Sequence, residues 1–223
     1  MPSTRSVVLL SGGLDSAANL AFCRAQDDPV LALTARYGQR AADAEVRAAR
    51  ALAETYGVRH EVVDLTWLGA LGGSALTQEA AAMPELRPDQ LDERAATEKS
   101  AKAVWVPNRN GVLINVAAAY AERLGATRVI VGFNREEAAT FPDNSGEFLG
   151  RATRSLEFST ANQVEVFCYT TQLDKREIVA KLERLEKPFP YDLIWSCYQA
   201  GPKACGLCES CRRLARALES RSL

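Results

Sequence analysis

Short apolar runs alternate with amphipathic stretches along this chain, which is the pattern of strands that alternate with helices. The β-branched run 6–10 predicts a buried strand, and the helical spacing of apolar residues over 15–25 predicts a helix. Residues 30–34 and 60–64 predict two more strands, with an amphipathic helix over 41–56 between them. The first part of the chain is therefore expected to run strand, helix, strand, helix, strand.

The alternation returns in the second half of the chain. We expect a helix after Pro107, a strongly apolar strand over 127–132, a helix over 146–161 and a strand over 164–169. Asp174 is expected to cap the helix that follows.

Residues 65–105 separate the two halves and lack a clear period. They contain Gly72-Gly73, two prolines and a mixed cluster of charges, so we expect an irregular surface insertion. A segment this long inside a compact domain is either mobile or functional. A cover over a ligand site and a contact between the copies of a homodimer are the functional options.

This alternation predicts an α/β fold: one domain over 1–223, with a doubly wound, mostly parallel sheet and helices on both faces. Ligands of such sheets bind beyond the carboxyl ends of the strands. Residues 11–16, 37–40 and 133–145 each follow a predicted strand. We therefore expect these three segments to form one pocket.

The segment Ser11-Gly12-Gly13-Leu14-Asp15-Ser16 links the first strand to the first helix. Two glycines allow a sharp turn, and the free N–H groups at the start of a helix attract anions. The loop is thus expected to hold phosphate, although it is not the Walker motif. Because a carboxylate repels phosphate, we assign Asp15 to Mg²⁺ or to capping the helix.

Four of the six cysteines crowd the end of the chain, at Cys197, Cys205, Cys208 and Cys211. Pairs separated by two residues can point their thiolates at one centre, so we expect a structural, tetrahedral Zn²⁺ site in a segment at about 190–223. An iron–sulfur cluster and free or redox thiols are the alternatives. Cys23 and Cys168 are expected to be buried small hydrophobic residues.

Composition sets limits on where and with what the protein works. Of its 223 residues, 47% are hydrophobic and 25% are charged, as is usual for a globular domain with a full core. A net charge of −1 argues against stable nucleic-acid binding. We see no apolar run that approaches the roughly 18 residues of a bilayer span, and no secretory signal, so we expect a cytoplasmic protein without membrane contact.

Several stretches, in this order and spacing, resemble the 7-cyano-7-deazaguanine synthases, a branch of the pyrophosphate-loop N-type ATP pyrophosphatases. The match covers nearly the whole chain. The stretches are SGGLDS at 11–16, YGQR at 37–40, VPNRN at 106–110, FPD at 141–143, LDK at 173–175 with Glu177, and the four-cysteine tail.

The resemblance implies an adenine nucleotide alpha hydrolase-like fold. It also implies that ATP activates 7-carboxy-7-deazaguanine as an acyl adenylate, that ammonia gives the amide, and that a second activation dehydrates the amide to the nitrile. Carried over, ATP and Mg²⁺ would bind at Leu10, Ser11, Gly12, Gly13, Leu14, Asp15 and Ser16. The catalytic residues would be Asp15, Arg109 and Lys175. The candidate contacts of the two bases are Tyr37, Gln39, Asn110, Phe141 and Asp143.

One stretch departs from the family. Many members have Ser-Gly-Tyr-Pro-Asp-Cys-Arg where this chain has Ala-Thr-Phe-Pro-Asp-Asn-Ser at 139–145. A sub-branch with the same reaction and a relative acting on another carboxylate are both compatible with this change. Two further alternatives are a tRNA-thiolating enzyme on the same loop, which would need a reactive cysteine pair, and a zinc-knuckle protein that binds RNA or a partner without catalysis.

Overall fold

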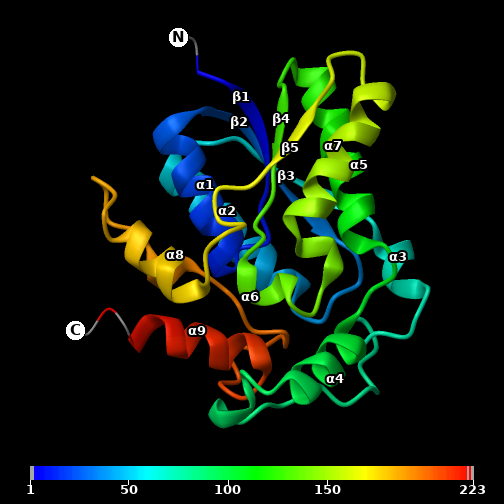
Figure 1. Cartoon of the computed structure of the whole chain (residues 1–223), viewed down its shortest axis with the longest axis vertical. Coiled ribbons are helices and arrows are strands. Elements are labelled where there is room, and N and C mark those ends of the chain that lie inside the picture. The colour runs from blue at the N-terminus through cyan, green and yellow to red at the C-terminus, as the bar shows by residue number, and fades with distance from the viewer. Residues whose placement is uncertain (1–2, 220, 222–223) are drawn as a thin grey trace.

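The computed structural model describes residues 3–219 and 221 of the chain. Its centre is one sheet of five parallel strands in the order β3-β2-β1-β4-β5 (Figure 1). The strands are β1 (Arg5–Leu9), β2 (Asp28–Arg36), β3 (His60–Asp64), β4 (Arg128–Ile130) and β5 (Glu165–Phe167). This confirms the expected parallel α/β sheet.

Helices cover both faces of the sheet because successive strand residues point to opposite sides. Val8 packs with α1 (Leu14–Gln26), α2 (Ala42–Tyr56) and α8 (Lys175–Leu182), whereas Val7 packs with α5 (Arg109–Leu124) and α7 (Gly146–Ser159). The other α-helices of the described residues are α3 (Thr66–Ala70), α4 (Arg94–Val104), α6 (Arg135–Ala138) and α9 (Glu209–Glu219). The doubly wound architecture is thus confirmed.

The direction of winding reverses between β1 and β4. From β1, the chain moves through β2 to β3 on one side, and it later returns to β4 and β5 on the other. Such a reversal opens a crevice at the carboxyl ends of the two central strands. The glycine loop 11–16 lies at this point because it directly follows β1.

The expectation that 65–105 is irregular throughout is wrong near both ends of the segment, because Thr66–Ala70 form the short helix α3 and a longer helix closes the segment. Residues Arg94–Val104 form α4, and its buried face consists of Thr97, Ser100, Ala101 and Val104. Small and polar residues on that face weaken the apolar period that marks a helix in a sequence. Hydrogen bonds from Ser100 to Glu209 and from Arg213 to the carbonyl of Leu91 join the segment to α9, next to which α4 lies in Figure 1.

Candidate active site and metal centre

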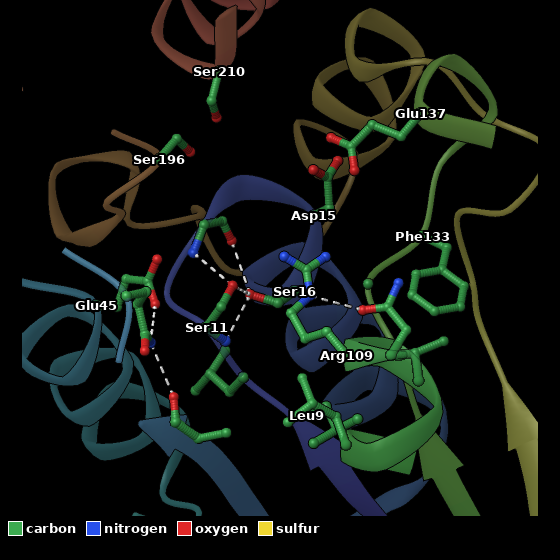
Figure 2. Close-up of a pocket in the computed structure, with 18 of the residues that line it drawn as sticks. Leu9, Ser11, Asp15, Ser16, Glu45, Arg109, Phe133, Glu137, Ser196 and Ser210 are labelled. Carbon is green, nitrogen blue, oxygen red and sulfur yellow. Dashed lines mark hydrogen bonds between the residues drawn. The ribbon is translucent and has the colours of Figure 1, made fainter. Parts of the chain in front are cut away.

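A cavity of about 230 Å³ lies at the reversal of the sheet (Figure 2). Its walls come from the glycine loop, the exit of β2, the start of α5, the segment after β4 and the C-terminal segment. The three segments that the sequence predicts to form one pocket therefore do so. Of the fourteen site residues predicted besides the cysteines, eleven line this cavity.

Nine of the predicted residues line it: Leu10, Ser11, Gly13, Leu14, Ser16, Tyr37, Gln39, Asn110 and Phe141. Asp15 and Arg109, two of the three predicted catalytic residues, also line it. Gly12, Asp143 and Lys175 lie outside the lining of the described chain. The individual roles of these residues stay predictions.

The glycine loop is held in one conformation by its own backbone and hydroxyls. Gly12 has φ +84°, and a Cβ there would lie 2.8 Å from the Cβ of Ala48, so only glycine fits. Ser16 Oγ accepts from the N–H of Ser11 at 3.2 Å and lies 3.0 Å from the Ser11 hydroxyl. Gly13 is the N-cap of α1 and has no side chain with which to cap this helix. The start of α1 therefore faces the cavity.

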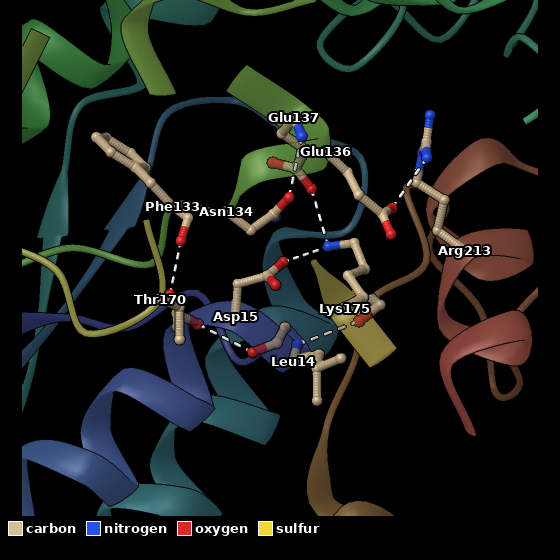
Figure 3. A network of polar contacts seen from close by, with 12 residues as sticks. Leu14, Asp15, Phe133, Asn134, Glu136, Glu137, Thr170, Lys175 and Arg213 are labelled. Atoms are coloured by element: carbon tan, nitrogen blue, oxygen red, sulfur yellow. Dashed lines mark hydrogen bonds and ion pairs between the residues drawn. The ribbon is translucent and has the colours of Figure 1, made fainter. Parts of the chain in front are cut away.

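Asp15 does not cap α1, so this option of the sequence interpretation is wrong. Its carboxylate instead pairs with Lys175, which also contacts Glu137 Oε1 at 2.9 Å (Figure 3). Lys175 is the first residue of α8. This helix begins with a capping box formed by Asp174 and Glu177. The Lys175 side chain is only 6% exposed, so the three charged groups form a buried cluster beside the cavity.

Burial and charge act against each other in this cluster. Burial disfavours the Lys175 ammonium, but the charges of Asp15 and Glu137 outweigh it and raise the pKa of Lys175. Burial raises the pKa of Asp15 above its ordinary value, although Lys175 opposes the shift. Asp15 Oδ1 is buried and has no hydrogen-bond partner among the described residues. A buried carboxylate oxygen without a partner is costly, and it suits a divalent cation with oxygen ligands such as Mg²⁺.

Arg109 and its neighbours form the wall at the start of α5. The Arg109 guanidinium lies 5.8 Å from the centre of the Tyr37 ring, and Nε donates to Asn110 Oδ1 at 3.2 Å. Asn110 in turn donates to the carbonyl of Asp143 at 3.3 Å. The ring of Phe141 lies nearly parallel to that of Trp105, with an angle of 9°. A cation, an amide and aromatic faces thus converge on one side of the cavity.

Gln39 is committed to the protein, and a carboxylate stands beside it. Its Oε1 accepts from the N–H of Tyr37, and its Nε2 donates to the carbonyl of Ala35 and to Glu45 Oε2. Glu45 lines the cavity from the first turn of α2, and burial raises its pKa. Gln39 therefore holds Glu45 in place and keeps no donor for a ligand in this conformation.

Sequence reasoning did not select several cavity residues. Glu45 and Glu137 each stand in the first turn of a helix that follows a strand, and this position near a carboxyl strand end is the signal that could have identified them. Trp195, Ser196 and Ser210 carry no such signal, because they reach the cavity only through the packing of the C-terminal segment.

The four clustered cysteines meet in space. One sulfur from each of Cys197, Cys205, Cys208 and Cys211 lies within 4.8 Å of the other three. Backbone N–H groups of Gln199 and Cys205 point at Cys197 Sγ, both at 3.4 Å, as expected for a thiolate that binds a metal. The cluster could bind a metal, and four sulfur ligands are the donor set of structural zinc sites.

The other two cysteines lie elsewhere. Cys23 lies on the buried face of α1, as expected, and burial raises the pKa of its thiol to about 12. Cys168 directly follows β5 and is only partly buried, which differs from the expected full burial, and its sulfur lies 3.3 Å from the hydroxyl of Thr170. Among the described residues, no helix is both long and apolar enough to cross a bilayer.

Fold and site together define an α/β protein with a glycine-rich loop at the cavity between β1 and α1 and a four-cysteine cluster near its C-terminus. Residues 5–222 match the family of the queuosine biosynthesis protein QueC. The chain belongs to this family, which confirms the resemblance inferred from its motifs.

Individual relatives cover almost the full length. The 7-cyano-7-deazaguanine synthase of Desulforudis audaxviator is 53% identical over 97% of both chains. That of Desulforamulus reducens is 50% identical over 98% of this chain and 95% of the relative. Among solved structures, the match to NMN synthetase from Francisella tularensis covers 100% of this chain and 88% of that chain, with 14% identity and a TM-score of 0.47.

Proposed function

We propose that this protein is an ATP-dependent ligase that converts 7-carboxy-7-deazaguanine and ammonia into 7-cyano-7-deazaguanine. The names of the full-length relatives support the product. The observation that carries the chemistry is the convergence of the glycine loop, the Asp15–Lys175–Glu137 cluster and Arg109 around one cavity. Anion-binding amides and two cationic side chains at one place suit a reaction in which pyrophosphate leaves ATP.

In this proposal, the loop holds the β- and γ-phosphates. The N–H groups at the start of α1 and the hydroxyls of Ser11 and Ser16 donate to phosphate oxygens. Asp15 and Glu137 would hold Mg²⁺, which supplies charge neutralisation on the phosphates when it is bound. Arg109 lines the cavity, so it can stabilise the charge that develops on the transferring α-phosphate.

Lys175 does not line the cavity itself but contacts Asp15, which does. Its ammonium fixes the Asp15 carboxylate, and in the transition state it stabilises the negative charge that builds up on the leaving pyrophosphate. Because α8 presents Lys175 from its first turn, the position of this ammonium depends on the capping box of that helix.

The base would lie between the β2 exit and the segment after β4. Tyr37 and Phe141 offer aromatic faces, and Asn110 is held by Asp143 at the same wall. Glu45 adds an acceptor for a donor edge of a base or a ribose. We place Asp143 behind Asn110 as a residue that orients it.

The reaction then proceeds through two activations. A carboxylate oxygen of the acid attacks the α-phosphate of ATP and pyrophosphate leaves, after which ammonia displaces AMP and gives the amide. The amide oxygen attacks the α-phosphate of a second ATP. Departure of AMP with that oxygen, and loss of the nitrogen-bound protons, leave the nitrile. The one histidine, His60, is hydrogen-bonded to Thr34 and is not among the cavity residues, so no step uses a histidine base.

We further propose that the four cysteines hold structural Zn²⁺. Unbridged clustered thiols suit a reducing compartment, so the cytoplasm is the proposed place of action. The thiolation alternative has less support, because Cys23 is a buried thiol with a raised pKa and such thiols are inert.

A product assay tests the proposal. Protein with bound zinc is incubated with ATP, Mg²⁺, ¹⁵N-ammonium and 7-carboxy-7-deazaguanine, and mass spectrometry follows nitrile, amide and AMP. We expect a ¹⁵N-labelled nitrile together with AMP. Folded, zinc-loaded protein that gives no turnover with this acid would contradict the proposal and favour a sub-branch that acts on another carboxylate or acceptor.

A further inference from the structure

A short segment joins the four-cysteine cluster to the glycine loop. The backbone N–H of Trp195 donates to the carbonyl of Gly12 at 2.8 Å. The N–H of Leu14, at the start of α1, donates to Ser196 Oγ at 3.3 Å. The next residue is Cys197, whose carbonyl accepts from Trp195 Nε1 at 3.0 Å. The residue before one cluster cysteine therefore contacts an amide that faces the cavity.

A second serine reaches the same end of the cavity from α9. Ser210 directly precedes Cys211 and lines the cavity together with Ser196. Figure 2 shows both side chains above the glycine loop, on ribbons of the C-terminal segment. The Ser210 hydroxyl has no hydrogen-bond partner in the part of the chain that the structure describes. Each of these serines is thus one residue away from a cluster cysteine.

The position of Ser210 is fixed from its other side as well. Its neighbour Glu209 is buried and pairs with Arg213 Nε at 2.9 Å. Arg213 also pairs with Glu136 at 3.0 Å, and Glu136 precedes Glu137 of the charged cluster (Figure 3). The first turn of α9 is therefore held over the cavity by ion pairs as well as by the cysteines.

We propose that the four-cysteine segment forms part of the polyphosphate site, with the Ser196 and Ser210 hydroxyls as donors to the β- and γ-phosphates of ATP. This inference rests on the proposed function. Ser196 already accepts from the Leu14 N–H, which leaves its own proton for a phosphate oxygen. Ser210 has both its donor and its acceptor capacity free. A metal at the cysteines then fixes two phosphate ligands in addition to stabilising the fold.

The test compares ligands that differ in the phosphates beyond the first. Calorimetric titration measures the binding of α,β-methylene-ATP and of AMP, each with Mg²⁺, to the zinc-loaded full chain. Ser196→Ala and Ser210→Ala are compared with Leu207→Ala, a half-exposed residue that also precedes a cluster cysteine. We expect each serine variant to bind the ATP analogue about tenfold more weakly than wild type, because a hydrogen bond to a charged group is lost. The affinity for AMP should stay within about twofold of wild type, because AMP lacks the β- and γ-phosphates. Leu207→Ala should change neither.

If Ser196→Ala loses zinc, the result for Ser210→Ala decides, because the Ser210 hydroxyl makes no hydrogen bond within the described chain whose loss would destabilise the fold. Analogue binding by Ser210→Ala equal to that of wild type overturns the inference. Equal weakening for AMP and the analogue also overturns it, since that result indicates a general structural effect. Wild-type protein that binds no ATP analogue would instead remove the proposed function itself.

Discussion

Replacing Lys175 with methionine removes the buried ammonium that lies between two partly buried carboxylates. The variant keeps a long unbranched side chain, so the packing of α8 changes little, but Asp15 and Glu137 lose their shared partner. Breaking a buried ion pair in this way costs about 3–5 kcal/mol. Because the Glu137 side chain is 33% exposed and water screens part of its charge, we expect the lower end, about 3 kcal/mol.

The loss should depend on pH in a defined direction. In the wild type, Lys175 lowers the pKa of both Asp15 and Glu137, so both values rise in the variant. Their folded-state pKa values then lie above those of the unfolded chain, and the folded state takes up protons as the pH falls. The variant is therefore expected to regain part of its free energy of unfolding between pH 8 and pH 5.5. The gain is up to about 1.4 kcal/mol per pH unit for each carboxyl that is protonated in the folded state but not in the unfolded state.

Urea unfolding at pH 8 and pH 5.5 measures both effects. Lys187→Met is the matched control, because Lys187 is exposed, and we expect it to stay within about 0.5 kcal/mol of the wild type. A Lys175→Met variant as stable as the control at pH 8 would refute the reasoning. A loss of the same size at both pH values would also refute it, since it would point to packing and not to the two carboxylates.

Three further substitutions test other parts of the site. Gly12→Ala should lower the free energy of unfolding by about 1–3 kcal/mol, because Gly12 has φ +84° and the new Cβ would clash with Ala48. The control is Gly150→Ala on α7, where a Cβ meets open space. In the same thermal melt, this control should be neutral or stabilising. Cys208→Ser should lose the bound metal and lower Tm by roughly 5 °C or more, because a closed thiolate site contributes folding energy. The control Cys168→Ser lies outside the cluster and should leave the metal content of the protein unchanged. Full metal content and an unchanged Tm for Cys208→Ser would contradict the zinc proposal. Asp15→Ala should abolish AMP release and retain the fold, and normal AMP release by a folded variant would count against the role of the loop.

The parallel sheet could be predicted because its signals are local. The predicted strand over 60–64 is β3 (His60–Asp64), and the helix over 41–56 is α2 within one residue, since each has its own apolar period. The helix α4 was missed because its buried face carries Thr97 and Ser100 in place of large apolar residues.

The candidate site likewise has a part that a local sequence pattern reveals and a part that only the fold brings together. Residues 11–16 are contiguous, so the loop could be recognised before the fold was known. The ion pair of Asp15 with Lys175 joins residues 160 positions apart, and no local pattern reports it. Ser196 and Ser210 look like ordinary serines of a cysteine-rich tail until packing brings that tail onto α1.

The fate of the oxygen atoms of the acid tests the central claim most directly. With both carboxylate oxygens of 7-carboxy-7-deazaguanine labelled with ¹⁸O, two successive adenylations predict that the AMP from each step carries one ¹⁸O and that no label enters pyrophosphate. Mass spectrometry of the released nucleotides during turnover gives the answer. Unlabelled AMP, or ADP with labelled phosphate, would contradict activation of the acid at the α-phosphate and with it the role assigned to the glycine loop.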